Sequence, residues 1–187
     1  MLDDLQKIHE RDPQDALGIA DKQGSQLGLE FQLEPQQRDI WNVVLAGMGG
    51  SALSALVAQA WPGLRVPFEV VRNYEIPDYL GEKTLFVASS YSGNTEETVS
   101  ALKEAGKTGA AIVVIASGGK LEQMAHEHGY PFLKLPGGYQ PRHVVPASLK
   151  ALVTVFDAYG LTTGAAEQLA IMADVVAGYT AQWAPSV

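Results

Sequence analysis

Two loops of this sequence carry residue types that can hold a phosphate group without lysine or arginine. The first, Gly47-Met48-Gly49-Gly50-Ser51, precedes a helix-forming stretch, so its backbone amides and one hydroxyl can face an anion. The second, Ser89-Ser90-Tyr91-Ser92-Gly93-Asn94-Thr95, gathers hydroxyls around a glycine. Hydroxyls and free amides are neutral donors that suit a dianion. We therefore predict a phosphate site in the second loop, with the hydroxyls of Ser90, Ser92 and Thr95 as donors.

The second loop also has a purely structural explanation. Asn94 or Thr95 can cap the following helix, and Glu97 stands at the spacing of a capping-box partner for Asn94. One side chain is enough to cap a helix, however, so capping does not explain why several hydroxyls surround Gly93. Phosphate binding accounts for all of them and is the favoured interpretation.

The glycine-rich first loop has two further explanations. A glycine turn between a strand and a helix is a common packing device in α/β proteins. The spacing Gly47-x-Gly49-x-x-Ala52 also fits a dinucleotide-binding fingerprint loosely, which would need an acidic residue about 20 positions later. Glu69 and Glu75 meet that requirement only approximately. A nucleotide-binding oxidoreductase is therefore the weaker hypothesis.

Both loops fall between a predicted strand and a predicted helix. Apolar, β-branched runs predict strands at 40–46, 66–71, 84–88, 110–116 and 131–135. Helical patterns follow at 51–61, 95–105, 120–128, 147–159 and 163–183, after short helices within 4–27. Continuous apolar strands that alternate with helices predict a doubly wound α/β fold, a five-stranded parallel sheet covered by helices on both faces. In such sheets ligands bind beyond the carboxyl ends of the strands.

Composition narrows the class of protein. The 187 residues, 47% hydrophobic and 18% charged, fit one main globular domain, and a net charge of -8 disfavours nucleic acid and acidic membranes as partners. The absence of cysteine excludes disulfides and thiolate metal sites. We expect no metal, because His126 and His128 would face different sides of a helix. Acidic residues at the start and short apolar runs predict neither export nor membrane spans, and hence a cytoplasmic protein.

The two loops, together with Ser117-Gly118-Gly119-Lys120-Leu121 and Gln140-Pro141-Arg142, resemble the sugar isomerase (SIS) domain family. The resemblance covers about residues 40–155 and is strongest to its bifunctional phosphoglucose/phosphomannose isomerase branch. It implies a flavodoxin-like sheet, a hexose 6-phosphate ligand and no cofactor. The implied reaction interconverts glucose 6-phosphate or mannose 6-phosphate with fructose 6-phosphate through a cis-enediol. By position, Ser51, Ser90, Ser92 and Thr95 would contact the phosphate, and Gly49 and Gly50 would give it room. Arg142 would be the catalytic residue that faces the reacting carbons.

The resemblance also implies a division of the chain. Residues 1–38 would form an N-terminal helical arm, 39–160 the phosphosugar-binding SIS domain, and 161–187 a helix that leads toward a second SIS domain. In the isomerases it resembles, the base glutamate, a ring-opening histidine and a lysine belong to that second domain. The first-turn acids Glu96 and Glu97, and the loop residues Lys120 and His143, are poor substitutes.

We therefore expect the chain alone to bind substrate but to be inactive. A non-catalytic module that senses a sugar phosphate is the alternative from another class, since a chain without a base fits it too. Exposed apolar residues on the last helices predict association, as a homodimer or with a second SIS domain.

Overall fold

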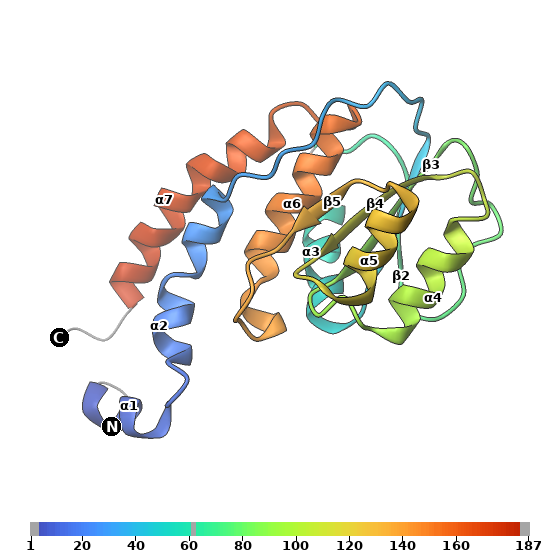
Figure 1. The fold of residues 1–187 in the computed structure, drawn as a ribbon. Helices are drawn as coiled ribbons and strands as arrows, with labels where there is room; N and C mark the ends of the chain where they lie inside the picture. The colour runs from blue at the N-terminus through green and yellow to red at the C-terminus, as the bar shows by residue number, and fades with distance from the viewer. Residues whose placement is uncertain (1–3, 61–62, 184–187) are drawn as a thin grey trace.

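Short runs of β-branched and apolar residues form the central sheet. In the computed structural model, which describes residues 4–60 and 63–183, the strands are β1 (Asn42–Ala46), β2 (Phe68–Val71), β3 (Thr84–Ser90), β4 (Ala111–Ala116) and β5 (Phe132–Lys134). Their order is β2-β1-β3-β4-β5, and every neighbouring pair is parallel (Figure 1). The predicted five-stranded parallel sheet is confirmed.

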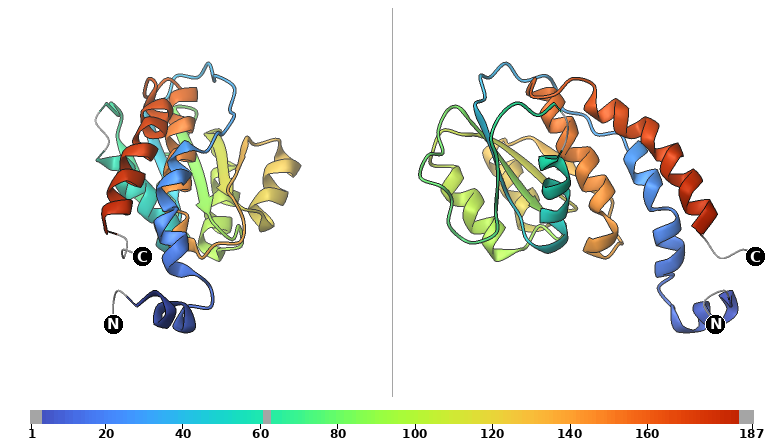
Figure 2. Two further views of the ribbon diagram at one scale, coloured as in Figure 1. Left: turned by 90° about the vertical axis from the view of Figure 1, so that its left-hand side faces the viewer. Right: turned by 180° about the vertical axis from the view of Figure 1, so that it is seen from behind.

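Helices cover both faces of the sheet. α3 (Gly49–Gln59) and α6 (Val145–Ala158) pack on one face, and α4 (Glu96–Ala105) and α5 (Gly119–His128) on the other (Figure 2). Side chains of a strand alternate between the two faces, so Val43 and Leu45 join the α3–α6 core while Val44 and Ala46 join the other core. The doubly wound architecture follows from this two-sided burial.

Several predicted boundaries differ from the structure by one or two residues, and two of the differences lie at the candidate loops. β3 runs two residues further than expected and includes Ser89 and Ser90, because these residues pair with Ile115 and Ala116 of β4. The helix predicted for 51–61 is α3, which begins at Gly49; residue 61 of that prediction lies outside the described residues. Ser90 is therefore a buried strand residue at the entrance to the loop.

The N-terminal segment and the last helix form an arm beside the domain. α1 (Leu5–Arg11), α2 (Ala16–Asp21) and the 3₁₀ helix η1 (Gln23–Gly28) precede the sheet, and α7 (Ala165–Trp183) follows α6. α7 packs on η1 so closely that a Cβ on Gly24 would lie 2.7 Å from Val176 Cγ1. In Figure 1 both segments extend away from the sheet toward the same end of the molecule.

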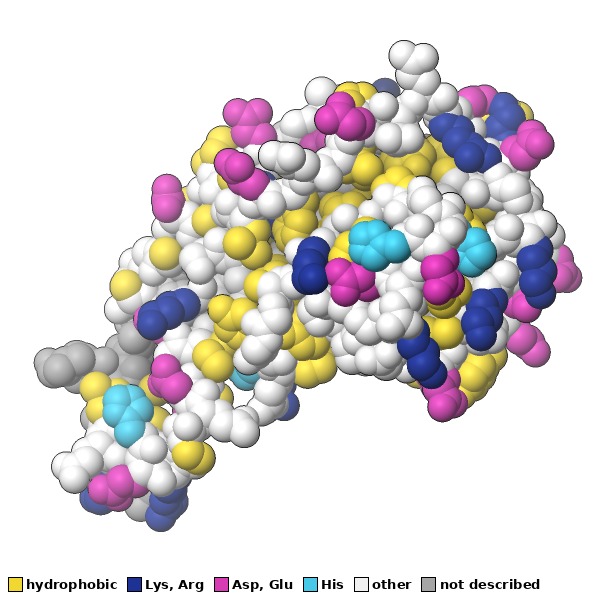
Figure 3. Space-filling model, in the orientation of Figure 1, with side chains coloured by type: hydrophobic (Ala, Val, Ile, Leu, Met, Phe, Trp, Pro, Cys, Tyr) yellow, Lys and Arg dark blue, Asp and Glu magenta, His cyan; other side chains and the backbone are white. Residues whose placement is uncertain are grey.

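α7 presents apolar side chains to solvent, as the sequence predicts. Ile171 is 65% exposed, and Met172 and Val175 are also exposed. Figure 3 shows hydrophobic side chains along this helix. None of the helices in the described part of the chain combines the length and the apolarity that crossing a bilayer requires.

Replacing Lys150 with methionine is expected to stabilise the protein. Lys150 of α6 is buried, its ammonium donates to the Ala166 carbonyl, and burial lowers its pKa below the ordinary value of 10.5. Between the lowered and the ordinary pKa the unfolded chain binds more protons, so stability rises with pH in that range. The variant should gain roughly 1 kcal/mol at neutral pH and lose that alkaline rise, measured by urea unfolding at several pH values. An unchanged pH profile would contradict this account.

Candidate functional site

The candidate site lies where the chain reverses its direction across the sheet. β1 and β3 are neighbours, but the chain leaves β1 toward β2 on one side and β3 toward β4 on the other. The carboxyl ends of such strands border a crevice, the usual ligand position in doubly wound folds. The glycine loop (residues 47–51) follows β1 and the serine loop (residues 90–95) contains the end of β3. The structure thus places both predicted loops at the switch point.

Each of the predicted hydroxyls forms a hydrogen bond, and among the described residues one pair of them is bonded directly. Ser90 Oγ lies 2.8 Å from Thr95 Oγ1, and Ser51 Oγ accepts the backbone N–H of Tyr91 at 3.0 Å. Ser92 Oγ accepts the backbone N–H of Asn94 at 3.3 Å. No hydrogen bond among the described residues joins the Ser92 hydroxyl to those of the other three. The structure therefore brings Ser51, Ser90 and Thr95 together and leaves Ser92 on the exposed side of the serine loop.

This pattern leaves hydroxyl protons available for an acceptor. Ser51 and Ser92 use their oxygens as acceptors, so the proton of each can be donated elsewhere. In the pair of Ser90 and Thr95 one hydroxyl donates to the other, and the proton of the acceptor stays free. An oxyanion at the switch point could accept these protons without any basic side chain.

The starts of α3 and α4 add backbone donors. Their N-cap residues, Met48 and Thr95, make no side-chain capping hydrogen bond. The first amides of a helix have no intrahelical partner, and the helix dipole favours an anion in front of them. α4 also carries Glu96 and Glu97 in its first turn, and the charge of Glu97 is the main cause that raises the pKa of Tyr74. Neutral donors and first-turn carboxylates thus share the same helix start.

The predicted capping box at α4 is wrong. The Asn94 side chain does not cap this helix; its amide donates to the Ser92 carbonyl at 3.0 Å and its oxygen accepts the Lys120 N–H at 3.1 Å. The physical reason is that the serine loop packs against the start of α5, whose backbone needs an acceptor. Asn94 therefore joins the serine loop to the loop after β4.

The arginine loop (residues 136–143) brings Arg142 to the same edge. Its last three residues form the 3₁₀ helix η2 (Pro141–His143), and a Cβ on Gly50 would lie 3.1 Å from the Pro141 carbonyl oxygen. The absence of a side chain at Gly50 therefore allows the arginine loop to approach the glycine loop. Arg142 is exposed, and its guanidinium forms no ion pair within the described residues. A free cation thus stands on the loop beside the candidate phosphate position.

Sequence analysis missed two residues that organise this edge. Gln26 of η1 is buried, donates to the His143 carbonyl at 2.8 Å and accepts the Ala147 N–H at 3.3 Å. Tyr91 forms hydrogen bonds to the three loops around it. A large aromatic residue within a run of serines is a signal that could have singled out Tyr91, whereas Gln26 has no such signal.

Other residues weighed from the sequence lie in simpler surroundings. His128 stacks on Tyr130 with ring centroids 5.4 Å apart, and His126 lies 6.0 Å from Phe132. His143 has a buried Nε2 that finds no hydrogen-bond partner in the part of the chain that the structure describes. Nothing in these contacts gives the histidines a part in the candidate site.

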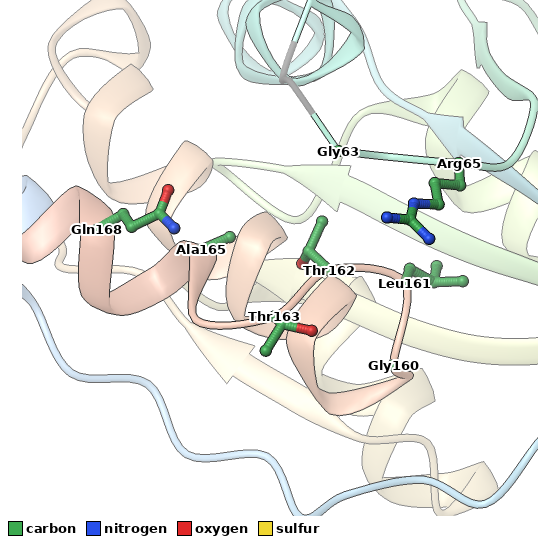
Figure 4. A pocket seen from close by; sticks show the side chains of 8 residues that line it. All are labelled: Gly63, Arg65, Gly160, Leu161, Thr162, Thr163, Ala165 and Gln168. Atoms are coloured by element: carbon green, nitrogen blue, oxygen red, sulfur yellow. The ribbon is translucent and has the colours of Figure 1, made fainter.

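A cavity of about 290 Å³ lies at the opposite edge of the sheet (Figure 4). Its walls include Arg65, Thr162, Thr163 and Gln168. Thr162 Oγ1 already donates to Asp157, which also caps the start of α7 through the Ala165 and Ala166 amides. These bonds occupy the Thr162 hydroxyl and the first amides of α7, and we assign the cavity no ligand.

A doubly wound α/β domain with uncapped helix starts and a hydroxyl-rich loop at its switch point belongs to the class of anion-binding domains. The SIS domain profile matches residues 38–130. These residues of the chain therefore form a SIS domain. Over 164 residues the chain is 35% identical to a bifunctional phosphoglucose/phosphomannose isomerase of Caldicellulosiruptor bescii, a match that covers 87% of this chain and 48% of that protein.

A further relative is similar in sequence, and a solved structure is similar in fold. A D-glucosamine-6-phosphate 4-epimerase of Sulfolobus acidocaldarius is 39% identical over 135 residues, which cover 68% of this chain and 43% of the epimerase. The solved structure of tagatose-6-phosphate ketose/aldose isomerase from Escherichia coli aligns with a TM-score of 0.55 at 18% identity, over 78% of this chain and 44% of that one. The chain spans about half the length of the curated relatives it matches.

Proposed function

We propose that this chain binds a hexose 6-phosphate and forms part of an aldose–ketose isomerase for glucose 6-phosphate or mannose 6-phosphate and fructose 6-phosphate. The observation that carries the proposal is the approach of Pro141 to Gly50, which sets a free arginine beside the hydroxyl-rich loops. The similarity to a bifunctional phosphoglucose/phosphomannose isomerase supports the choice of substrate. An acidic chain without cysteine is compatible with a cytoplasmic location.

In this proposal the predicted site residues have two roles, phosphate binding and stabilisation of the intermediate. The contacts to phosphate come from Gly49, Gly50, Ser51, Ser90, Ser92 and Thr95. Isomerisation moves a proton between adjacent carbons, and the intermediate enediolate needs a cation near its oxygen. Arg142 supplies that cation. The base and the ring-opening acid come from a second SIS domain, so we expect substrate binding without turnover by this chain.

The domain division follows the same proposal. Residues 39–160 form the ligand-binding domain, 1–38 the arm, and 161–187 the helix that leads toward the second domain. The exposed apolar side chains of α7 support association through this helix, in a homodimer or with a second SIS domain. Sedimentation velocity would test the homodimer, because a chain that stays monomeric at all concentrations contradicts it and leaves the second SIS domain as the partner.

Calorimetric titration with fructose 6-phosphate tests the proposal most directly. Free fructose and inorganic phosphate are the controls, and a coupled isomerase assay is run on the same sample. Binding of fructose 6-phosphate without turnover is the expected result. Turnover would show that a base lies within these residues, and the absence of binding by any phosphorylated ligand would reject the site.

The non-catalytic sensor stays the alternative, and it makes a distinguishable prediction. A sensor needs no cation at the reacting carbons, so Arg142→Met should leave its affinity for the acid analogue 5-phospho-D-arabinonate unchanged. An isomerase half should lose affinity for 5-phospho-D-arabinonate, whose carboxylate stands in for the enediolate. Glucosamine 6-phosphate is added to the titration because a relative is named as its 4-epimerase.

A further inference from the structure

Tyr91 contacts each of the other loops at the carboxyl edge of the sheet. Its backbone N–H donates to Ser51 Oγ of the glycine loop at 3.0 Å. Its carbonyl accepts both the N–H and the hydroxyl of Ser117, after β4, at 2.9 and 2.6 Å. Its own hydroxyl oxygen accepts the Tyr139 N–H of the arginine loop at 2.9 Å. One residue of the serine loop is therefore bonded to all three neighbouring loops.

Of these bonds, the one to Tyr139 involves the side chain of Tyr91. It is made between a pair of glycines and Gln140, whose side-chain amide donates to Gln14 of the arm at 2.7 Å. Gly137 and Gly138 precede Tyr139, a Cβ on either would meet nothing within 4 Å, and Gly138 has a φ of +87°. Beyond Tyr139 the turn of η2 is closed by the His143 N–H donating to the Gln140 carbonyl at 2.9 Å. The Tyr91 hydroxyl thus anchors the loop just before the rigid turn that carries Arg142.

The opposite end of the arginine loop is held by the arm. Gln26 bonds the backbone of His143 and Ala147, and Gln23 donates to the Arg142 carbonyl at 3.3 Å. These bonds do not depend on the serine loop. Tyr91 is therefore the side chain that links the position of Arg142 to the loop proposed to hold phosphate.

We propose that Tyr91 is a positioning residue, whose hydroxyl sets the distance between the phosphate position and Arg142. The inference rests on the proposed function, because it assigns the phosphate to the serine loop and the cation to Arg142. The expected consequence of losing this hydroxyl is a selective loss of affinity. Losing the hydroxyl should leave the phosphate end of a ligand bound as before and weaken only the contact at its far end.

Tyr91→Phe removes the hydroxyl and keeps the ring and all backbone bonds of Tyr91. Affinity is measured by calorimetry for inorganic phosphate and for 5-phospho-D-arabinonate, which carries phosphate at one end and a carboxylate at the other. The expected result is phosphate affinity within about twofold of wild type and aldonate affinity lower by roughly threefold to tenfold, the range for one neutral hydrogen bond. Tyr130→Phe, on the amino side of β5, is the matched control and should change neither affinity.

A double-mutant cycle separates positioning from simple loss of structure. In an Arg142→Met background the loop no longer carries the cation, so adding Tyr91→Phe should change aldonate affinity by less than about twofold. An equal loss of phosphate and aldonate affinity, no loss of either, or the same loss in both backgrounds would each overturn the inference. If wild type binds neither ligand, the proposed function fails first and the positioning role falls with it.

Discussion

Replacing Gly93 with alanine is expected to destabilise the protein more than any other single methyl group added near the site. Gly93 is buried in the serine loop with a φ of +67°, a conformation that is costly for alanine. An added Cβ would also lie 1.7 Å from the Gly118 carbonyl oxygen. The three nearest atoms are backbone atoms of Gly118 and Gly119, so no flexible side chain can move aside. We expect a loss of at least about 3 kcal/mol in the free energy of unfolding.

The loss of stability should extend to the start of α5, after β4. The Gly93 carbonyl accepts the Leu121 N–H at 3.0 Å, so displacing Gly93 also displaces the first turn of α5. Urea unfolding monitored by circular dichroism measures the effect. Gly178→Ala is the control, because Gly178 is an exposed helical residue with open space around it and alanine there should stabilise by up to about 1 kcal/mol. A stability for Gly93→Ala within about 1 kcal/mol of wild type would contradict the proposed packing.

The sequence was sufficient to predict the fold because periodicity and burial agree along it. The strand over 110–116 is apolar at every position, and β4 is buried on both faces, as a central parallel strand must be. Glycines after Ala46 and hydroxyls after Ala88 marked the ends of neighbouring strands, so the two loops could be expected at one edge. These features are local, and local patterns survive in a single sequence.

The connections between the loops could not be predicted in the same way. Asn94 has the residue type and position of a helix cap, yet it bonds to Lys120, 26 residues away in the sequence. Gln26 reaches His143 across 117 residues, and Tyr91 reaches Tyr139 across 48. A polar side chain satisfies whichever backbone group the fold brings near, and nothing in its neighbours along the chain specifies that partner. The candidate donors were therefore predictable, whereas the framework that orients them was not.

Removing the hydroxyls of Ser92 and Thr95 together is expected to weaken phosphate-monoester binding by roughly 100-fold. A hydrogen bond from a hydroxyl to a charged acceptor contributes about 1.5 to 3 kcal/mol, so losing two gives at least that factor. Ser92→Ala/Thr95→Val removes both donors with little change in volume. Ser92 is exposed, and within the described residues the Thr95 hydroxyl bonds only to that of Ser90. The free energy of unfolding should therefore fall by no more than about 2 kcal/mol.

The contrast between these two quantities decides what the serine loop does. If its hydroxyls only shaped a turn, the double variant would lose stability and keep its affinity for fructose 6-phosphate; if they bind phosphate, it loses affinity and stays folded. Thr154→Val/Thr180→Val is the matched control, because each of those hydroxyls donates to a helical carbonyl, of Lys150 and Val176, in α6 and α7. Calorimetry with fructose 6-phosphate gives the affinity and urea unfolding the stability. A folded double variant with the affinity of the control would show that the phosphate is held elsewhere.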